Sequence, residues 1–285
     1  MILREALSQA ETRIAARGIP DARIEAELLL MHSLGIMKAE LYARLGDALF
    51  PEENERFCHL IERRLQHEPT PYILNQCQFY GLDLYVDSRV LIPRPETELL
   101  VDTALTFMKQ RFLQGQACSV ADIGTGSGAV AIALALHLPQ AKVYATDLSA
   151  DALEVALMNC GKHGVLKQVH LLQGDMLEPL PHPVALIAAN LPYVRDSDLP
   201  SLMPEIREFE PMSALIAGKD GLEKIDQLLS QAGHKLLSNG AIVLEIGQGQ
   251  GPAVTALAKN CFPDSQIGLF PDLANIDRVL RVLPR

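Results

Sequence analysis

The sequence has no excess of basic residues. Its 285 residues include 25 lysines and arginines against 35 aspartates and glutamates, which gives a formal net charge of −10. Residues 1–89 hold 10 basic and 14 acidic residues, and the remainder holds 15 and 21, so neither part is basic. Proteins that bind a nucleic-acid backbone through many contacts need clustered positive charge. The composition therefore argues against a nucleic acid as a direct partner.

Paired cysteines and long apolar runs are also missing. The histidines show no ligand spacing and the five cysteines show no metal-type spacing, so we expect no metal site and reduced thiols. The longest apolar run, residues 129–136, is too short to span a bilayer. The first residues lack the apolar core of a signal peptide. These absences predict a soluble, cytoplasmic protein that does not associate with membranes.

Residues 1–75 are predicted to form a small helical domain. Apolar residues recur at helical spacing in four stretches, near residues 2–18, 24–30, 38–45 and 51–65. Pro69 and Pro71 then interrupt the helical pattern. The four helices carry no chemical motif, so the domain either recognises a partner or stabilises the domain that follows.

A hairpin and a larger domain are predicted after it. Residues 76–92 contain an alternating segment about Gly81, which is typical of a β-hairpin linker. In residues 93–285, apolar strand patterns alternate with helices that start near residues 129 and 150 and with a helix over residues 222–237. A polar loop is expected to follow residue 193 and run to about residue 211. The expected strands are 118–123, 142–146, 169–172, 184–189, 241–246, 266–270 and 278–283. We therefore predict an α/β, Rossmann-like, seven-stranded sheet whose last strand is reversed.

The segment VADIGTGSGAVA, residues 120–131, joins the first of these strands to a helix. Such a turn exposes backbone N–H groups where a nucleotide-like cofactor can bind. A turn without a ligand would not need three glycines, since each one costs backbone entropy. The loop residues expected to contact the cofactor are Gly124, Thr125, Gly126, Ser127 and Gly128.

Acidic residues end the first three strands, where ligands bind in open α/β sheets. Each suits S-adenosylmethionine. Asp147 can accept both ribose hydroxyls, and Asp175 can accept the adenine amine while Met176 packs on the ring. Asp122 can face the cationic methionine end, directly or through water. A pyrophosphate-bearing dinucleotide suits this acidic cluster less well.

The most specific feature is Asn190-Leu191-Pro192-Tyr193, after the fourth strand. It resembles the Asn-Pro-Pro-Tyr site of enzymes that methylate planar NH₂ groups of glutamine, adenine or cytosine. The Asn190 oxygen and the Leu191 carbonyl can each accept one N–H of that group. Tyr193 offers it a flat face, and Pro192 favours an extended Leu191. An ordinary turn after a strand is the simpler interpretation.

Several segments together resemble the PrmC/HemK family of peptide chain release factor glutamine N5-methyltransferases. The matching segments are VLIPRPETE, ADIGTGSGAVAIALA, ATDLS, NLPY, FEP followed by AGKDGL, and EIGQGQG. The resemblance implies a class I S-adenosylmethionine-dependent methyltransferase that releases S-adenosylhomocysteine. It implies that the glutamine of the Gly-Gly-Gln motif in class 1 release factors is the acceptor, held by residues 190–193, and that the N-terminal domain holds the release factor. It also implies that Asn190 contacts the cofactor, together with residues 124–128, Asp147 and Met176. The IPRPETE loop would close over the cofactor pocket, and we expect a monomer.

Three alternatives stay open. Ribosomal-protein glutamine methyltransferases share the glycine loop and the Asn-Pro-Pro-Tyr site, but differ from IPRPETE after the arginine. A nucleic-acid adenine-N6 methyltransferase would use the same four-residue site, although basic surface is missing. A module that binds the cofactor without transferring the methyl group is the third, because Leu191 stands where the family has proline.

Overall fold

The computed structural model describes residues 1–111 and 118–284, which form two compact units. The first contains residues 1–76 together with 203–209, and the second contains residues 77–202 and those from 210 onward. The hairpin that we expected as a linker belongs to the second unit. The roles that we assigned to the domains, and their exact limits, stay predictions.

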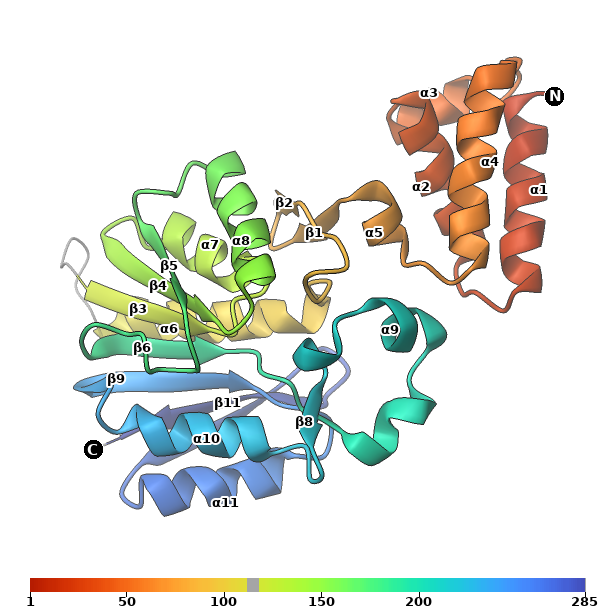
Figure 1. The fold of residues 1–285 in the computed structure, drawn as a ribbon. Coiled ribbons are helices and arrows are strands. Elements are labelled where there is room, and N and C mark those ends of the chain that lie inside the picture. Colours follow the sequence, from red (N-terminus) through yellow and green to blue (C-terminus); the bar gives the residue numbers. More distant parts are fainter. Residues whose placement is uncertain (112–117, 285) are drawn as a thin grey trace. The chain divides into compact units, whose positions relative to one another are not determined.

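The first unit is helical (Figure 1). Its elements are α1 (Leu3–Ala16), α2 (Ala22–Leu34), α3 (Lys38–Ala43), α4 (Pro51–Leu65), α5 (Thr70–Leu74) and α9 (Pro204–Phe209). The first four lie where the apolar spacing predicts them, and their buried faces meet around Leu7, Leu29 and Ile61. We did not predict α5. Prolines are tolerated where a helix begins because the first N–H groups have no intrahelical partner, so Pro69 and Pro71 start this helix.

The second unit contains the seven-stranded sheet, in the order β10-β11-β9-β6-β3-β4-β5. The strands are β3 (Cys118–Ile123), β4 (Ala141–Asp147), β5 (Val169–Gln173), β6 (Val184–Ala189), β9 (Leu236–Glu245), β10 (Gln266–Pro271) and β11 (Asp277–Leu283). Strands β5, β4, β3, β6 and β9 run parallel, while β11 is antiparallel to both β9 and β10. The predicted α/β sheet with a reversed last strand is confirmed.

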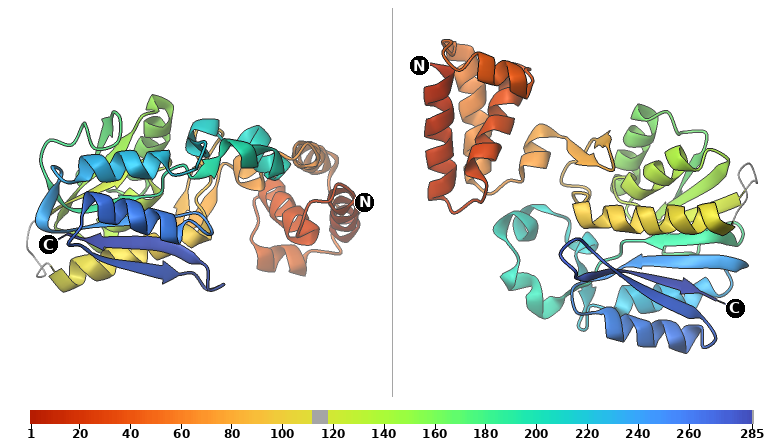
Figure 2. Two further views of the ribbon diagram at one scale, coloured as in Figure 1. Left: turned by 90° about the horizontal axis from the view of Figure 1, so that it is seen from below. Right: turned by 180° about the vertical axis from the view of Figure 1, so that it is seen from behind.

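Helices cover both faces of the sheet (Figures 1 and 2). One face carries α6 (Glu98–Arg111), α7 (Ala129–His137) and α8 (Ala150–Lys162), and the other carries α10 (Glu223–Ala232) and α11 (Gly251–Cys261). Side chains alternate along β3, so that Val120 packs on the face covered by α6, α7 and α8, and Ala121 packs on the face covered by α10 and α11. The sheet is thus buried on both sides, and only its edges and strand ends remain for a ligand.

The end of one helix differs from our prediction. We expected a helix over residues 222–237, but α10 ends at Ala232 and β9 already begins at Leu236. Leu236 pairs with Val184 of β6. Leu236 continues the helical spacing of Leu229 and Ala232, so the apolar periodicity alone does not mark the boundary between helix and strand. Helix α11 was not predicted either.

Short elements complete the second unit. They are the hairpin β1 (Cys77–Phe79) and β2 (Leu82–Leu84), the 3₁₀ turns η1 (Pro95–Thr97), η2 (Asp196–Ser201) and η3 (Met212–Ala214), and the strands β7 (Val194–Arg195) and β8 (Ile216–Gly218). The hairpin pairs antiparallel as expected. The segment that we took for a polar loop up to residue 211 contains β7, η2 and α9, and β7 pairs parallel with β8.

Candidate active site

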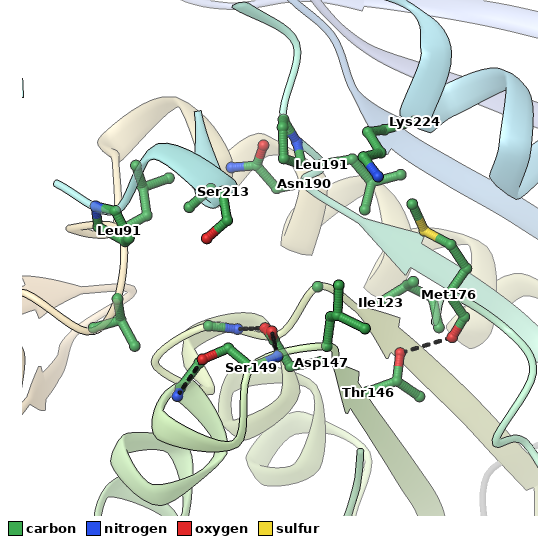
Figure 3. Close-up of a pocket in the computed structure, with 18 of the residues that line it drawn as sticks. Leu91, Ile123, Thr146, Asp147, Ser149, Met176, Asn190, Leu191, Ser213 and Lys224 are labelled. Carbon is green, nitrogen blue, oxygen red and sulfur yellow. Dashed lines mark hydrogen bonds between the residues drawn. The ribbon is translucent and has the colours of Figure 1, made fainter. Parts of the chain in front are cut away.

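A pocket of about 310 Å³ lies at the carboxyl ends of the parallel strands (Figure 3). This volume is at the lower end of the range found for small-molecule sites. Its lining comes from the strand ends, the glycine loop and the segments around residues 90 and 212. The lining residues are Arg89, Val90, Leu91, Ile123, Gly124, Gly126, Thr146, Asp147, Leu148, Ser149, Ala152, Gly174, Asp175, Met176, Asn190, Leu191, Pro192, Pro211, Ser213, Ala214 and Lys224.

Most of the predicted site residues come together here. Those in the pocket lining are Gly124, Gly126, Asp147, Asp175, Met176, Asn190, Leu191 and Pro192. Those outside the lining are Asp122, Thr125, Ser127, Gly128 and Tyr193. The contacts that we predicted between these residues and a cofactor stay predictions.

The Asp147 carboxylate is fixed in place at the wall of this pocket. Its Oδ2 accepts the Gly126 N–H at 2.9 Å, and its Oδ1 accepts the Ser149 N–H at 2.9 Å (Figure 3). Asp175 is held by Gln227, whose Nε2 donates to Asp175 Oδ2 at 2.6 Å. Two oriented carboxylates therefore face one cavity, which favours a ligand that carries positive charge or hydrogen-bond donors.

Met176 and Lys224 lie at one end of the pocket (Figure 3). The Thr146 hydroxyl donates to the Met176 carbonyl at 3.0 Å, and Met176 has a positive φ of 48°. This bond holds the turn that places the Met176 side chain on the wall. Sequence reasoning did not find Lys224, because a lone lysine in the first turn of an amphipathic helix is indistinguishable from a solvated one.

Asp122 lies beneath the glycine loop and is 2% exposed. Its Oδ2 accepts both the Thr125 hydroxyl at 2.6 Å and the Ala131 N–H at 3.0 Å. Burial raises the pKa of Asp122 to about 7, against the lowering effect of these two bonds. In this structure the Asp122 carboxyl group therefore connects the glycine loop to α7 through hydrogen bonds.

Asn190 follows β6 and faces the pocket from the side opposite Asp147 (Figure 3). Its Nδ2 donates to Thr97 Oγ1 at 3.0 Å. Thr97 is buried, and it belongs to the IPRPETE segment. Sequence reasoning quoted this segment but missed Thr97 as a site residue, because a contact across 93 positions leaves no local pattern.

Gln250 connects three of the motifs. Its Nε2 donates to the backbone carbonyls of Tyr193 at 3.2 Å and Gly221 at 3.0 Å, while its Oε1 accepts the Gly247 N–H at 2.8 Å. Burial raises the pKa of Tyr193 to about 12, and the Glu245 carboxylate adds to this effect. Tyr193 is thus a neutral phenol at physiological pH, on a backbone fixed by one buried glutamine.

An ion pair connects two further motifs. Arg94 Nη2 of the IPRPETE segment pairs with Glu210 Oε1 of the FEP segment, and the Glu210 side chain is almost fully buried. Buried carboxylates need a partner of opposite charge. The pair therefore fixes the loop before α6 against the segment that returns to β8.

Two absences concern only residues 1–111 and 118–284. Within these ranges, no group of three or more histidine, cysteine, aspartate or glutamate side chains is arranged to hold a metal ion. None of the helices in the same ranges is long and apolar enough to cross a membrane.

Comparison with known proteins gives matches over nearly the whole chain. Residues 5–74 match the family model described as PrmC N-terminal domain, and residues 120–209 match the one described as methyltransferase domain. The chain is 41% identical over 279 residues to the release factor glutamine methyltransferase of Moorella thermoacetica, covering 98% of this chain and 97% of the relative. It is 38% identical to the protein of the same name from Thermodesulfovibrio yellowstonii, covering 90% of each.

Solved structures share the fold at low identity. The hMettl16 catalytic domain, solved in complex with MAT2A 3'UTR hairpin 6, matches with a TM-score of 0.58 at 13% identity and covers 81% of each chain. A methyltransferase from Pyrococcus furiosus matches with a TM-score of 0.53 at 18% identity, covering 72% of this chain and 90% of that one. These likenesses concern the fold alone.

Proposed function

The chain belongs to the release factor glutamine methyltransferase family, and we propose that it transfers a methyl group from S-adenosylmethionine to a glutamine of class 1 peptide chain release factors. The acceptor is the side-chain amide nitrogen, N5, of the glutamine in the Gly-Gly-Gln motif. A substrate of this kind places the enzyme in the cytoplasm.

One observation carries the proposal. Asn190 lines the pocket, and its Nδ2 is already engaged by Thr97. This leaves its Oδ1 as the atom that can accept a hydrogen bond from an incoming NH₂ group. The Leu191 carbonyl, next in the chain, supplies the second acceptor. Such a pair suits a planar amide with two N–H donors, because each oxygen can take one of them.

The residues of the pocket fit S-adenosylmethionine in chemistry. Asp147 and Asp175 supply carboxylates that can accept from hydroxyl and amine groups, and Met176 supplies an apolar wall for a ring. A Cβ at Gly126 would meet nothing within 4 Å, so the loop is open toward the pocket. When bound, this cofactor supplies a methyl group on a positively charged sulfur.

The chain's own residues address the weak nucleophilicity of an amide. Its nitrogen lone pair is delocalised, so orientation counts for more than basicity. The oxygens of residues 190 and 191 would hold both N–H groups and stabilise the positive charge that develops on the nitrogen. Tyr193 stays uncharged and would hold the planar group by its face. The nitrogen becomes acidic on methylation and loses its proton, so no strong base is required.

The test is methylation of a purified release factor. The protein is incubated with a bacterial class 1 release factor and isotopically labelled S-adenosylmethionine, and the peptide that contains Gly-Gly-Gln is analysed by mass spectrometry. We expect the label on the glutamine side chain, and no label on a release factor in which this glutamine is replaced by alanine.

Other acceptors decide between the alternatives. Label in ribosomal protein or in nucleic acid, with none in the release factor, would overturn the proposal in favour of those substrates. Cofactor that binds without transfer of its methyl group to any of these acceptors would identify a binding module instead.

A further inference from the structure

A buried chain of polar groups leads away from the pocket behind Asn190. Asn190 Nδ2 donates to Thr97 Oγ1 at 3.0 Å. The Thr97 hydroxyl also interacts with the Glu245 carboxyl group and lowers its pKa. Thr97 is 4% exposed and Glu245 is 2% exposed. The three residues come from β6, the IPRPETE segment and the end of β9, so the sheet brings them together from distant parts of the sequence.

The direction of these hydrogen bonds follows from the number of hydrogens that each group carries. A hydroxyl carries one hydrogen and a carboxylate carries none. When Thr97 donates to the Glu245 carboxylate, it can only accept from Asn190. The end of the Asn190 carboxamide that faces Thr97 must then be the NH₂ group. Its oxygen is left to point away from Thr97.

We propose that Glu245 and Thr97 are positioning residues that set which end of the Asn190 carboxamide is presented to the substrate. The effect on methyl transfer rests on the proposed function, whereas the orientation of the Asn190 carboxamide does not. An acceptor at Asn190 suits an incoming NH₂ group, whereas a donor there would repel it. The carboxylate at residue 245 therefore acts on the reaction without contacting the reacting atoms.

The opposite orientation becomes available when Glu245 takes up a proton. A carboxylic acid can donate to Thr97, which frees the Thr97 hydrogen to bond the Asn190 oxygen. The carboxamide can then turn over and present its NH₂ group to the pocket. Protonation at residue 245 is thus expected to reduce methyl transfer.

The surroundings of Glu245 bring its protonation into the neutral range. Burial raises the pKa of Glu245 to about 7, and the nearby Glu96 carboxylate raises it further, while the Thr97 hydrogen bond, Arg278 of β11 and Arg94 lower it. The charge of Glu245 in turn raises the pKa of the Tyr193 phenol. Within the part of the chain that the structure describes, Oε2 of Glu245 has no hydrogen-bond partner.

The first test reads the carboxamide directly and needs no methyl transfer. In ¹⁵N-labelled protein, the side-chain NH₂ resonances of Asn190 are assigned by their loss in Asn190→Asp. They are then followed from about pH 5.5 to about pH 8.5. We expect a shift with a midpoint near that of Glu245, which disappears in Glu245→Gln. Glu96→Gln, which removes an exposed neighbouring carboxylate, should keep the transition.

The second test reads the reaction. Thr97→Val keeps the shape but removes the hydroxyl, and we expect its kcat on the release factor to fall roughly tenfold or more with the KM for S-adenosylmethionine unchanged. Thr97→Ser restores the hydroxyl and should recover kcat to within about threefold. The kcat of the wild type should fall as the pH drops through the midpoint found by NMR. The kcat of Glu245→Gln should not fall over this pH range, but it should be lower than that of the wild type at high pH.

The outcomes separate this inference from the proposed function. Suppose that the wild type methylates the release factor. If the Asn190 resonances then do not change with pH, or if Thr97→Val has the kcat of the wild type, the positioning role is contradicted and the proposed function stands. If the wild type methylates nothing, the function fails and the NMR titration still decides the positioning. If Glu245→Gln does not fold, the inference is tested by Thr97→Val and Thr97→Ser together with the NMR titration of the wild type.

Discussion

The Leu191 side chain lies against Gly124. Its Cδ2 is 3.2 Å from the point that a Cβ on residue 124 would occupy. Gly124 has a φ of +71°, a conformation that L side chains rarely adopt. Leu191 stands where the resembling Asn-Pro-Pro-Tyr site has its first proline, and the structure places this departure directly on the glycine loop.

Gly124→Ala is expected to lower the free energy of unfolding by about 1–2 kcal/mol, because the left-handed backbone is strained and Leu191 must move. Gly126→Ala is the matched control, since Gly126 also has a positive φ but its added Cβ would meet nothing within 4 Å. Urea unfolding measures both. Equal losses in the two variants would show that the Leu191 contact contributes nothing.

Asp147→Asn is expected to weaken the binding of S-adenosylhomocysteine about tenfold or more, as measured by isothermal titration calorimetry. The carboxylate now accepts one N–H on each oxygen, from Gly126 and Ser149. An amide presents an NH₂ group to one of these donors, so it disturbs the loop as well as removing charge. Asp151→Asn, an exposed change in the first turn of α8, should bind like the wild type. Matching affinities for all three proteins would exclude Asp147 from the cofactor site.

The sequence specifies strands more sharply than it specifies contacts. The predicted limits of β3 and β6 match the structure residue for residue, and Gly124 or Asn190 directly follows each strand. The predicted end of α10 was wrong because Leu236, the first residue of β9, continues the helical spacing of Leu229 and Ala232. Helix α5 was missed because the prolines that end one helix also begin the next.

The candidate site was predictable where its residues sit at strand ends. Asp147, Asp175 and Asn190 follow successive parallel strands, so topology alone brings them to one pocket. The partners of these residues were not predictable. Gln250 and Thr97 act through bonds to residues 57 and 93 positions away. Periodicity and turn chemistry are local signals, and they carry no information about such pairs.

Gln250→Leu is expected to lower the free energy of unfolding by about 2–4 kcal/mol, because it leaves the Tyr193 and Gly221 carbonyls and the Gly247 N–H without their buried partner. Turnover should fall as well, since the backbone of residue 193 loses its support. Gln248→Leu, an exposed change two residues earlier, should alter neither property. Thermal or urea unfolding together with initial rates makes the comparison. A Gln250 variant as stable as the Gln248 variant would contradict this role.

Asp122→Asn is expected to flatten the pH dependence of stability. The pKa of Asp122 is raised to about 7 in the folded protein, above its ordinary value of 3.8, so the folded state binds more protons than the unfolded state between these values. The free energy of unfolding should therefore fall as pH rises from about 4 to above 7, on the order of 2–4 kcal/mol from this group. Asparagine keeps an acceptor oxygen for Thr125 and Ala131 but has no charge to bury. Urea unfolding at several pH values compares the two proteins, and parallel pH profiles would contradict the assignment.

Asn190→Ala is expected to reduce turnover about 10²-fold or more while the affinity for S-adenosylhomocysteine stays within about threefold. The substitution removes the oxygen that would orient the substrate amide, but it leaves the Asp147 and Asp175 carboxylates and the glycine loop in place. Single-turnover rates on the release factor give the first quantity, and calorimetry gives the second. A large loss of cofactor affinity would assign Asn190 to cofactor binding instead of to the acceptor. Turnover close to that of the wild type would remove the amide-orienting oxygen from the mechanism.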